Sequence, residues 1–131
     1  RLVGSEMCIR DSSKEELITS IIEFLENDVI EELNGQKRFH AHVAKNSLNI
    51  VLRQLKLEDK SSSMEKNRLS KILKTDKTIG EMNQILCSNI DNNKIDINNN
   101  ELIDHLFKTT MEKLEIDQPN YSGFLAEKNK S

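Results

Sequence analysis

The stretch ELIDHLFKTTMEKL, residues 101–114, decides the fold class of this chain. Its apolar side chains recur at spacings of three and four residues, the period of an amphipathic helix; they are Leu102, Ile103, Leu106, Phe107, Met111 and Leu114. His105 lies among the charged residues that we assign to the opposite, polar face. Asn98, with Glu101 three residues later, is typical of a helix start, and Pro119 disfavours continuation of a helix. The pattern predicts a helix over residues 99–116.

The same helical spacing continues outward through the rest of the chain. It predicts four further helices near residues 13–34, 36–57, 62–74 and 78–92. Ser13 and Thr78 are each followed by a glutamate three residues later, as at capped helix starts, and Gly35 suits a left-handed turn after the first helix. The polar run 58–63, EDKSSS, is interpreted as a loop. The fold class is therefore all-α, a single irregular or up-and-down bundle of about five helices with no sheet.

Three segments of different character are expected along the chain. Residues 1–12, RLVGSEMCIRDS, have no helical period and resemble a translated sequencing-adapter sequence, so we interpret them as a non-native or disordered leader. Residues 13–125 are predicted to form one helical domain. Residues 126–131 are polar and are predicted to form a frayed tail.

Composition narrows the class of protein. The 131 residues carry a net charge of −3, with 4% aromatic side chains, which argues against nucleic-acid binding because a basic stripe and a stacking platform are both missing. No apolar run approaches the ~20 residues of a membrane span. Cys87 has no partner outside the leader, so we expect a reducing, cytoplasmic location, and we interpret this cysteine as a small core residue.

Three collinear blocks resemble an uncharacterised bacterial helical domain family. FHAHVAKNSLNIV (39–51) resembles its FHARVAxNALxIV stretch, MNQILC (82–87) resembles its LNxxLC helix, and KLEIDQPNYSGF (113–124) resembles its C-terminal signature KLxIDQPxYSGY. His42 departs from the family pattern, which favours arginine there. The resemblance implies a gene neighbourhood with an aminoglycoside-phosphotransferase-like kinase and an acyl-CoA dehydrogenase, and hence a kinase-like partner.

Five polar residues are the candidates for binding a ligand or partner: His40, Asn46, Asp117, Gln118 and Tyr121. On a functional interpretation, His40 and Asn46 meet the segment around Asp117 and Tyr121 to form a polar site. On a structural interpretation, the same residues tie the C-terminal segment to the second helix by hydrogen bonds. In both cases Tyr121 or Phe124 is expected to pack back on the bundle.

Neither a metal nor a cofactor is expected. The histidines are His40, His42 and His105, and no zinc-binding spacing links them. The asparagine-rich run 91–101 fails as a calcium loop, because its sixth position is Asp96 where that loop needs glycine. No glycine-rich phosphate loop or kinase motif is present.

These observations lead to a non-catalytic accessory or interaction domain. Its partner would be a kinase-like phosphotransferase in acyl-CoA or carboxylic-acid metabolism, as the family resemblance implies. The alternative is a small enzyme or ligand-binding domain with a polar site at His40, Asn46, Asp117 and Tyr121. An enzyme needs a pocket where such groups converge, whereas an interaction domain needs an exposed apolar patch.

Overall fold

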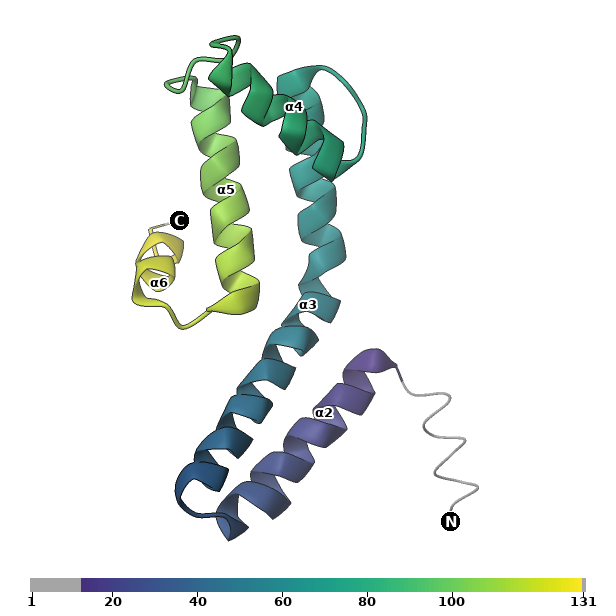
Figure 1. The fold of residues 1–131 in the computed structure, drawn as a ribbon, viewed down its shortest axis with the longest axis vertical. Helices are drawn as coiled ribbons and strands as arrows, with labels where there is room; N and C mark the ends of the chain where they lie inside the picture. The colour runs from purple at the N-terminus through teal and green to yellow at the C-terminus, as the bar shows by residue number, and fades with distance from the viewer. Residues whose placement is uncertain (1–12, 131) are drawn as a thin grey trace. The chain divides into compact units, whose positions relative to one another are not determined.

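A computed structural model describes residues 13–130, and these residues form helices and connecting turns without a strand. The predicted all-α fold is confirmed. The helices are α2 (Lys14–Phe24), α3 (Gly35–Leu73), α4 (Ile79–Asp91), α5 (Asn100–Asp117) and α6 (Ser122–Lys128) (Figure 1). A π-helical turn, η1 (Leu25–Val29), and a 3₁₀ turn, η2 (Ile30–Glu32), follow α2 directly.

The chain divides into two compact units at Lys56 and Leu57. The described part of the first unit is 13–56, and that of the second is 57–130. The leader predicted at 1–12 lies outside the described residues. The single domain predicted over 13–125 stays a prediction.

The first unit is a helical hairpin made by α2 and the beginning of α3 (Figure 1). The hydroxyl of Ser13 accepts a hydrogen bond from the Glu16 N–H at 3.1 Å, which is the predicted N-cap. Gly35 turns the chain with φ of +60°, a left-handed conformation that glycine adopts without Cβ strain. Ile22, Ile30 and Ala41 are buried.

The loop predicted at residues 58–63 is wrong, because α3 continues through it as one helix of 39 residues. The predicted helices 36–57 and 62–74 are therefore parts of the same helix. The run contains neither glycine nor proline, and Glu58 and Lys60 are good helix formers. A serine inside a helix lowers the stability of that helix by only about 0.5 kcal/mol relative to alanine. Three serines therefore do not interrupt a helix that packs against other elements elsewhere along its length.

The second unit consists of the end of α3 with α4, α5 and α6. Its core is formed by Leu69 of α3, Met82 and Leu86 of α4, and Leu102 of α5. The remaining apolar contacts come from partly buried residues around this core, namely Ile72, Leu73, Ile79, Ile90 and Ile95. This core fixes α3, α4 and α5 relative to one another within the unit.

The caps of the second unit agree with prediction at α4 and differ by one residue at α5. Thr78 accepts from the Glu81 N–H at 3.2 Å, as predicted. The cap of α5 is Asn99 instead of Asn98, and its side chain accepts from the backbone N–H groups of Glu101 and Leu102 at 2.9 and 3.1 Å. An asparagine run offers several possible caps, and the geometry of the preceding turn selects one.

The C-terminal signature forms a turn and the short helix α6, which contacts α5 (Figure 1). Phe124 is 4% exposed and Tyr121 is 52% exposed, so the predicted packing of one aromatic residue on the bundle is confirmed for Phe124. The ammonium group of Lys128 lies 5.6 Å from the centre of the Phe124 ring. α6 extends through Ala126 to Lys128, the beginning of the segment predicted as a tail.

Candidate functional site: a buried arginine–histidine cluster

The most unusual group in the described chain is His105, a histidine that is only 2% exposed. The sequence placed it on the polar face of its helix, and this prediction is wrong. His105 shares a face of α5 with Leu102 and Ile116, both buried, because spacings of three and four return to the same side of a helix. This face of α5 belongs to the core of the second unit.

Arg68 of α3 connects this face of α5 to α3 through four side-chain hydrogen bonds. Its Nε–H donates to Nδ1 of His105 at 3.1 Å, and Nη2 donates to Oγ1 of Thr109 at 3.0 Å. The guanidinium also forms a fork with the carboxylate of Glu112, with Nη2 2.5 Å from Oε1 and Nη1 3.5 Å from Oε2. The side chains of Arg68 and Glu112 are each 15% exposed, so this is a largely buried, charge-assisted contact.

The bond from Arg68 fixes the protonation state of His105. An arginine can only donate, so Nδ1 of His105 must accept and the ring proton resides on Nε2. Burial is the main cause that lowers the pKa of His105 below 6.5, and the positive charge of Arg68 lowers this pKa further. Three carboxylates act in the opposite direction, those of Glu65, Glu112 and Asp104. The neutral imidazole is therefore the form that the fold favours.

The cluster has the geometry of a structural tie. The donors of Arg68 point to three acceptor residues on α5. The hydrogen bonds of this guanidinium are therefore made within the protein and join α3 to α5. On α4, Asn83 Nδ2 lies 3.5 Å from Oε1 of Glu65, so α4 also contacts the edge of the cluster. Among the described side chains, none has a buried polar atom without a hydrogen-bond partner.

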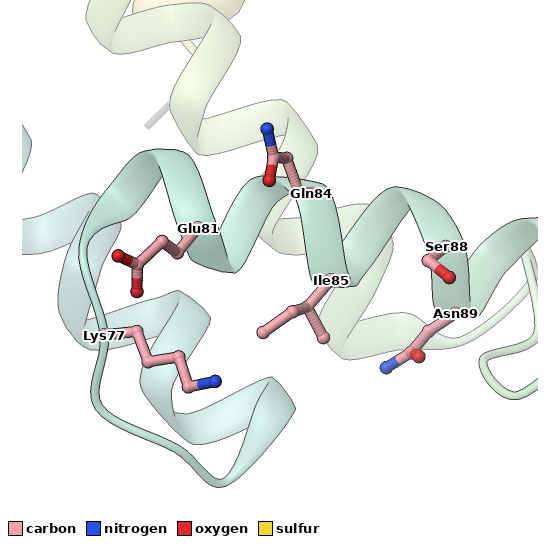
Figure 2. A pocket seen from close by; sticks show the side chains of 6 residues that line it. All are labelled: Lys77, Glu81, Gln84, Ile85, Ser88 and Asn89. Atoms are coloured by element: carbon pink, nitrogen blue, oxygen red, sulfur yellow. The ribbon is translucent and has the colours of Figure 1, made fainter.

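Two shallow hollows lie elsewhere, on the surface of α4. Figure 2 shows the first, whose side chains come from one side of α4 and from the preceding loop; they are Lys77, Glu81, Gln84, Ile85, Ser88 and Asn89. The second is lined partly by Asn83 and Cys87. Cys87 is exposed, so its predicted core position is wrong. Neither hollow is lined by His105 or by any of the five candidates from the sequence.

All five sequence candidates are exposed. His40 and Asn46 lie on α3 in the first unit, where the His40 ring is 5.9 Å from that of Phe39. Asp117, Gln118 and Tyr121 lie at the turn between α5 and α6 in the second unit. Because the two groups belong to different units, the predicted contact between them stays a prediction, as does their role in binding.

Sequence reasoning missed Arg68, Thr109 and Glu112, although a signal was present. His105, Thr109 and Glu112 follow one another at spacings of four and three, and Leu102 and Ile116 continue the same stripe on either side. Arg68 directly precedes the fully buried Leu69. A polar stripe bounded by apolar residues at both ends is the pattern of a buried polar contact, and an arginine elsewhere in the chain is its natural partner.

The described residues contain no group of histidine, cysteine and carboxylate side chains suited to hold a metal ion. Within the same residues, no helix has both the length and the apolar character needed to cross a membrane.

These features define an all-helical protein, in whose second unit the end of α3, α4 and α5 are joined by an apolar core and a buried arginine–histidine cluster. The model of the family described as Domain of unknown function (DUF6285) matches residues 31–121, and the chain belongs to this family. The match includes the blocks at 39–51 and 82–87 and ends at Tyr121. Comparison with curated proteins and with solved structures gave no match.

Proposed function

We propose that this chain is a non-catalytic interaction domain that binds a kinase-like phosphotransferase acting in acyl-CoA or carboxylic-acid metabolism. The observation that carries the proposal is an apolar surface on α5, formed by Ile103, Leu106 and Phe107. These three side chains are 50%, 48% and 49% exposed. Contiguous exposed apolar side chains of this size are typical of protein-binding surfaces.

The position of this surface on α5 follows from helix geometry. Successive residues turn by about 100° around a helix axis, so Ile103 and Phe107 point well away from Leu102 and His105, which face the core. The outward apolar surface continues toward the C-terminus through the partly buried Met111 and Leu114. Two further exposed apolar side chains lie in the same unit, Tyr121 directly before α6 and Leu125 within it.

The identity of the partner is supported by the resemblance of the three sequence blocks to a family encoded near such kinases. The alternative, an enzyme or ligand-binding site at His40, Asn46, Asp117 and Tyr121, has less support. These four residues are all exposed and belong to two different units of the chain. A catalytic role would require a concave site where such groups converge.

Calorimetric titration of the full chain with a purified aminoglycoside-phosphotransferase-like kinase tests the proposal. Phe107→Glu should weaken the complex at least tenfold, since a charge replaces an apolar anchor and each ~1.4 kcal/mol is a factor of ten. The matched control is Gln84→Glu, which adds the same charge at an exposed position of α4 and should change the affinity less than twofold. If the wild-type chain does not bind the kinase, the proposed partner is wrong; if both variants bind equally well, the proposed surface is wrong.

The five sequence candidates belong in the same titration. Because all are exposed, replacing them by alanine should leave the fold intact, and a loss of binding can be attributed to a lost contact. Asp117→Ala, Gln118→Ala and Tyr121→Ala test the turn after α5, while His40→Ala and Asn46→Ala test α3. A loss of kinase binding would add that position to the surface.

A further inference from the structure

The bond between Arg68 and His105 has a property that a purely apolar contact between α3 and α5 would lack. It needs an unprotonated Nδ1 on His105, because Arg68 offers only hydrogen-bond donors. A proton on Nδ1 removes the acceptor. It also places an imidazolium 3.1 Å from the arginine Nε in a site that is almost closed to water.

We propose that the hydrogen bond from Arg68 to His105 is an acid-sensitive latch within the contact between α3 and α5. This bond opens when Nδ1 of His105 takes up one proton from solvent, while the bonds of Arg68 to Thr109 and Glu112 remain. In the closed state, Nδ1 accepts from Arg68. In the open state, the imidazolium turns its Nδ1–H toward a carboxylate, and Arg68 keeps only its contacts with Thr109 and Glu112. The one new covalent bond is the N–H bond that the solvent proton forms with the lone pair of Nδ1, and no other group is gained or lost.

The charges around His105 supply the alternative partners. From α3 come Arg68 and Glu65, and from α5 come Glu112 and Asp104. Glu112 is already bound by the guanidinium of Arg68. Glu65 has only a long contact, 3.5 Å from Asn83 of α4. Glu65 is therefore the carboxylate that the structure leaves most able to receive the imidazolium.

The burial of His105 determines whether the latch opens as the pH falls or as it rises. A neutral histidine is favoured in a desolvated site next to an arginine, and the pKa of His105 is accordingly lowered. The latch is closed at neutral pH and opens only on acidification. His40 on α3 is instead exposed to solvent, whereas His105 is 2% exposed.

Nitrogen-15 NMR of the full chain, labelled at histidine and arginine, tests the latch directly. At pH 7, Nδ1 of His105 should have the shift of an unprotonated nitrogen, and the Nε–H of Arg68 should exchange slowly with solvent. As the pH falls below 6.5, through the lowered pKa of His105, this side chain should titrate, and the Arg68 Nε–H should exchange faster with the same midpoint. Since base-catalysed exchange of a guanidinium N–H slows as the pH falls, faster exchange is a distinctive sign of a broken bond.

The variant His105→Asn provides the control, because the asparagine oxygen lies near the position of Nδ1 and accepts a hydrogen bond without titrating. In this variant the Arg68 Nε–H should show no acceleration between pH 7 and 5. If the variant does not fold, the wild-type titration decides alone. The latch is ruled out if Arg68 exchange in the wild type shows no step at the His105 midpoint, if His105 does not titrate in the folded chain, or if the folded His105→Asn variant shows the same step.

Discussion

Arg68 of α3 donates its Nε–H to Nδ1 of His105 on α5 over 3.1 Å, joining residues that are 37 positions apart in the sequence. The same guanidinium binds Thr109 and Glu112 one and two turns further along α5. A single arginine thus aligns two helices along about two turns. This contact is polar and directional, whereas the neighbouring core around Leu69 and Leu102 is apolar, so the two together specify both the distance and the register of the helices.

Removing Arg68 should be costly. Arg68→Ala leaves Glu112 and His105 without their donor in a site where Glu112 is only 15% exposed, and we expect a loss of about 2–4 kcal/mol in the free energy of unfolding. Urea denaturation measures this loss. The matched control is Lys66→Ala, which breaks an ion pair with Asp76 whose side chains are 48% and 82% exposed and should cost less than about 1 kcal/mol. Equal losses in the two variants would show that the cluster does not stabilise the fold.

The pH dependence of stability should have a definite sign. The pKa of His105 is lowered in the folded chain, so between the folded pKa and 6.5 the unfolded chain binds more protons. The contribution of neutral His105 is therefore complete above pH 6.5 and is lost as the pH falls through the folded pKa. Thermal unfolding from pH 7.5 to 5 measures this loss in the wild type. This loss should be smaller in His105→Asn; a wild-type profile that rises on acidification would contradict the assignment.

The continuity of α3 at residues 58–63 can be tested at Ser63. Ser63→Pro should cost about 3 kcal/mol, because proline removes one helical hydrogen bond and clashes with the preceding turn. Ser63→Ala should instead add about 0.5 kcal/mol. Ser122→Pro is the control, because Ser122 is the first residue of α6, a position that tolerates proline. If Ser63→Pro is as stable as Ser122→Pro by urea denaturation and circular dichroism, the segment is a loop.

Two glycines should respond to alanine with opposite signs. Gly35 has φ of +60°, so Gly35→Ala should cost about 1–2 kcal/mol. Gly80 lies in the first turn of α4, and an added Cβ meets nothing within 4 Å, so Gly80→Ala should stabilise the chain by about 0.5–1 kcal/mol. Differential scanning calorimetry of the two variants gives the signs. A gain from Gly35→Ala would mean that the turn does not need its left-handed residue.

The two aromatic residues of the C-terminal signature should separate stability from surface function. Phe124 is buried, so Phe124→Ala should cost about 3 kcal/mol. Tyr121 is 52% exposed, so Tyr121→Ala should change the free energy of unfolding by only about 0.5 kcal/mol. Urea denaturation distinguishes the two. A large loss for Tyr121→Ala together with a small one for Phe124→Ala would reverse the assigned roles.

The sequence by itself determined the local features of this protein: helical period, the caps at Ser13 and Thr78, and the turn at Gly35. Each of these depends on side chains within four residues of one another, so the evidence is contiguous in the chain. The continuity of α3 was missed because a polar, serine-rich run resembles a loop. The residues of this run neither strongly favour nor strongly disfavour a helix, so the packing of α3 on either side of the run determines its conformation.

Only the tertiary structure decided which face of α5 is buried. This helix has two candidate faces, and the one richer in apolar residues, with Ile103 and Phe107, is exposed. The face that carries His105 is buried because Leu102 completes the core with Leu69 and because Arg68 supplies the partner that a buried histidine requires. Burial of a polar group depends on a donor from a distant part of the chain, and no pattern within α5 specifies that donor.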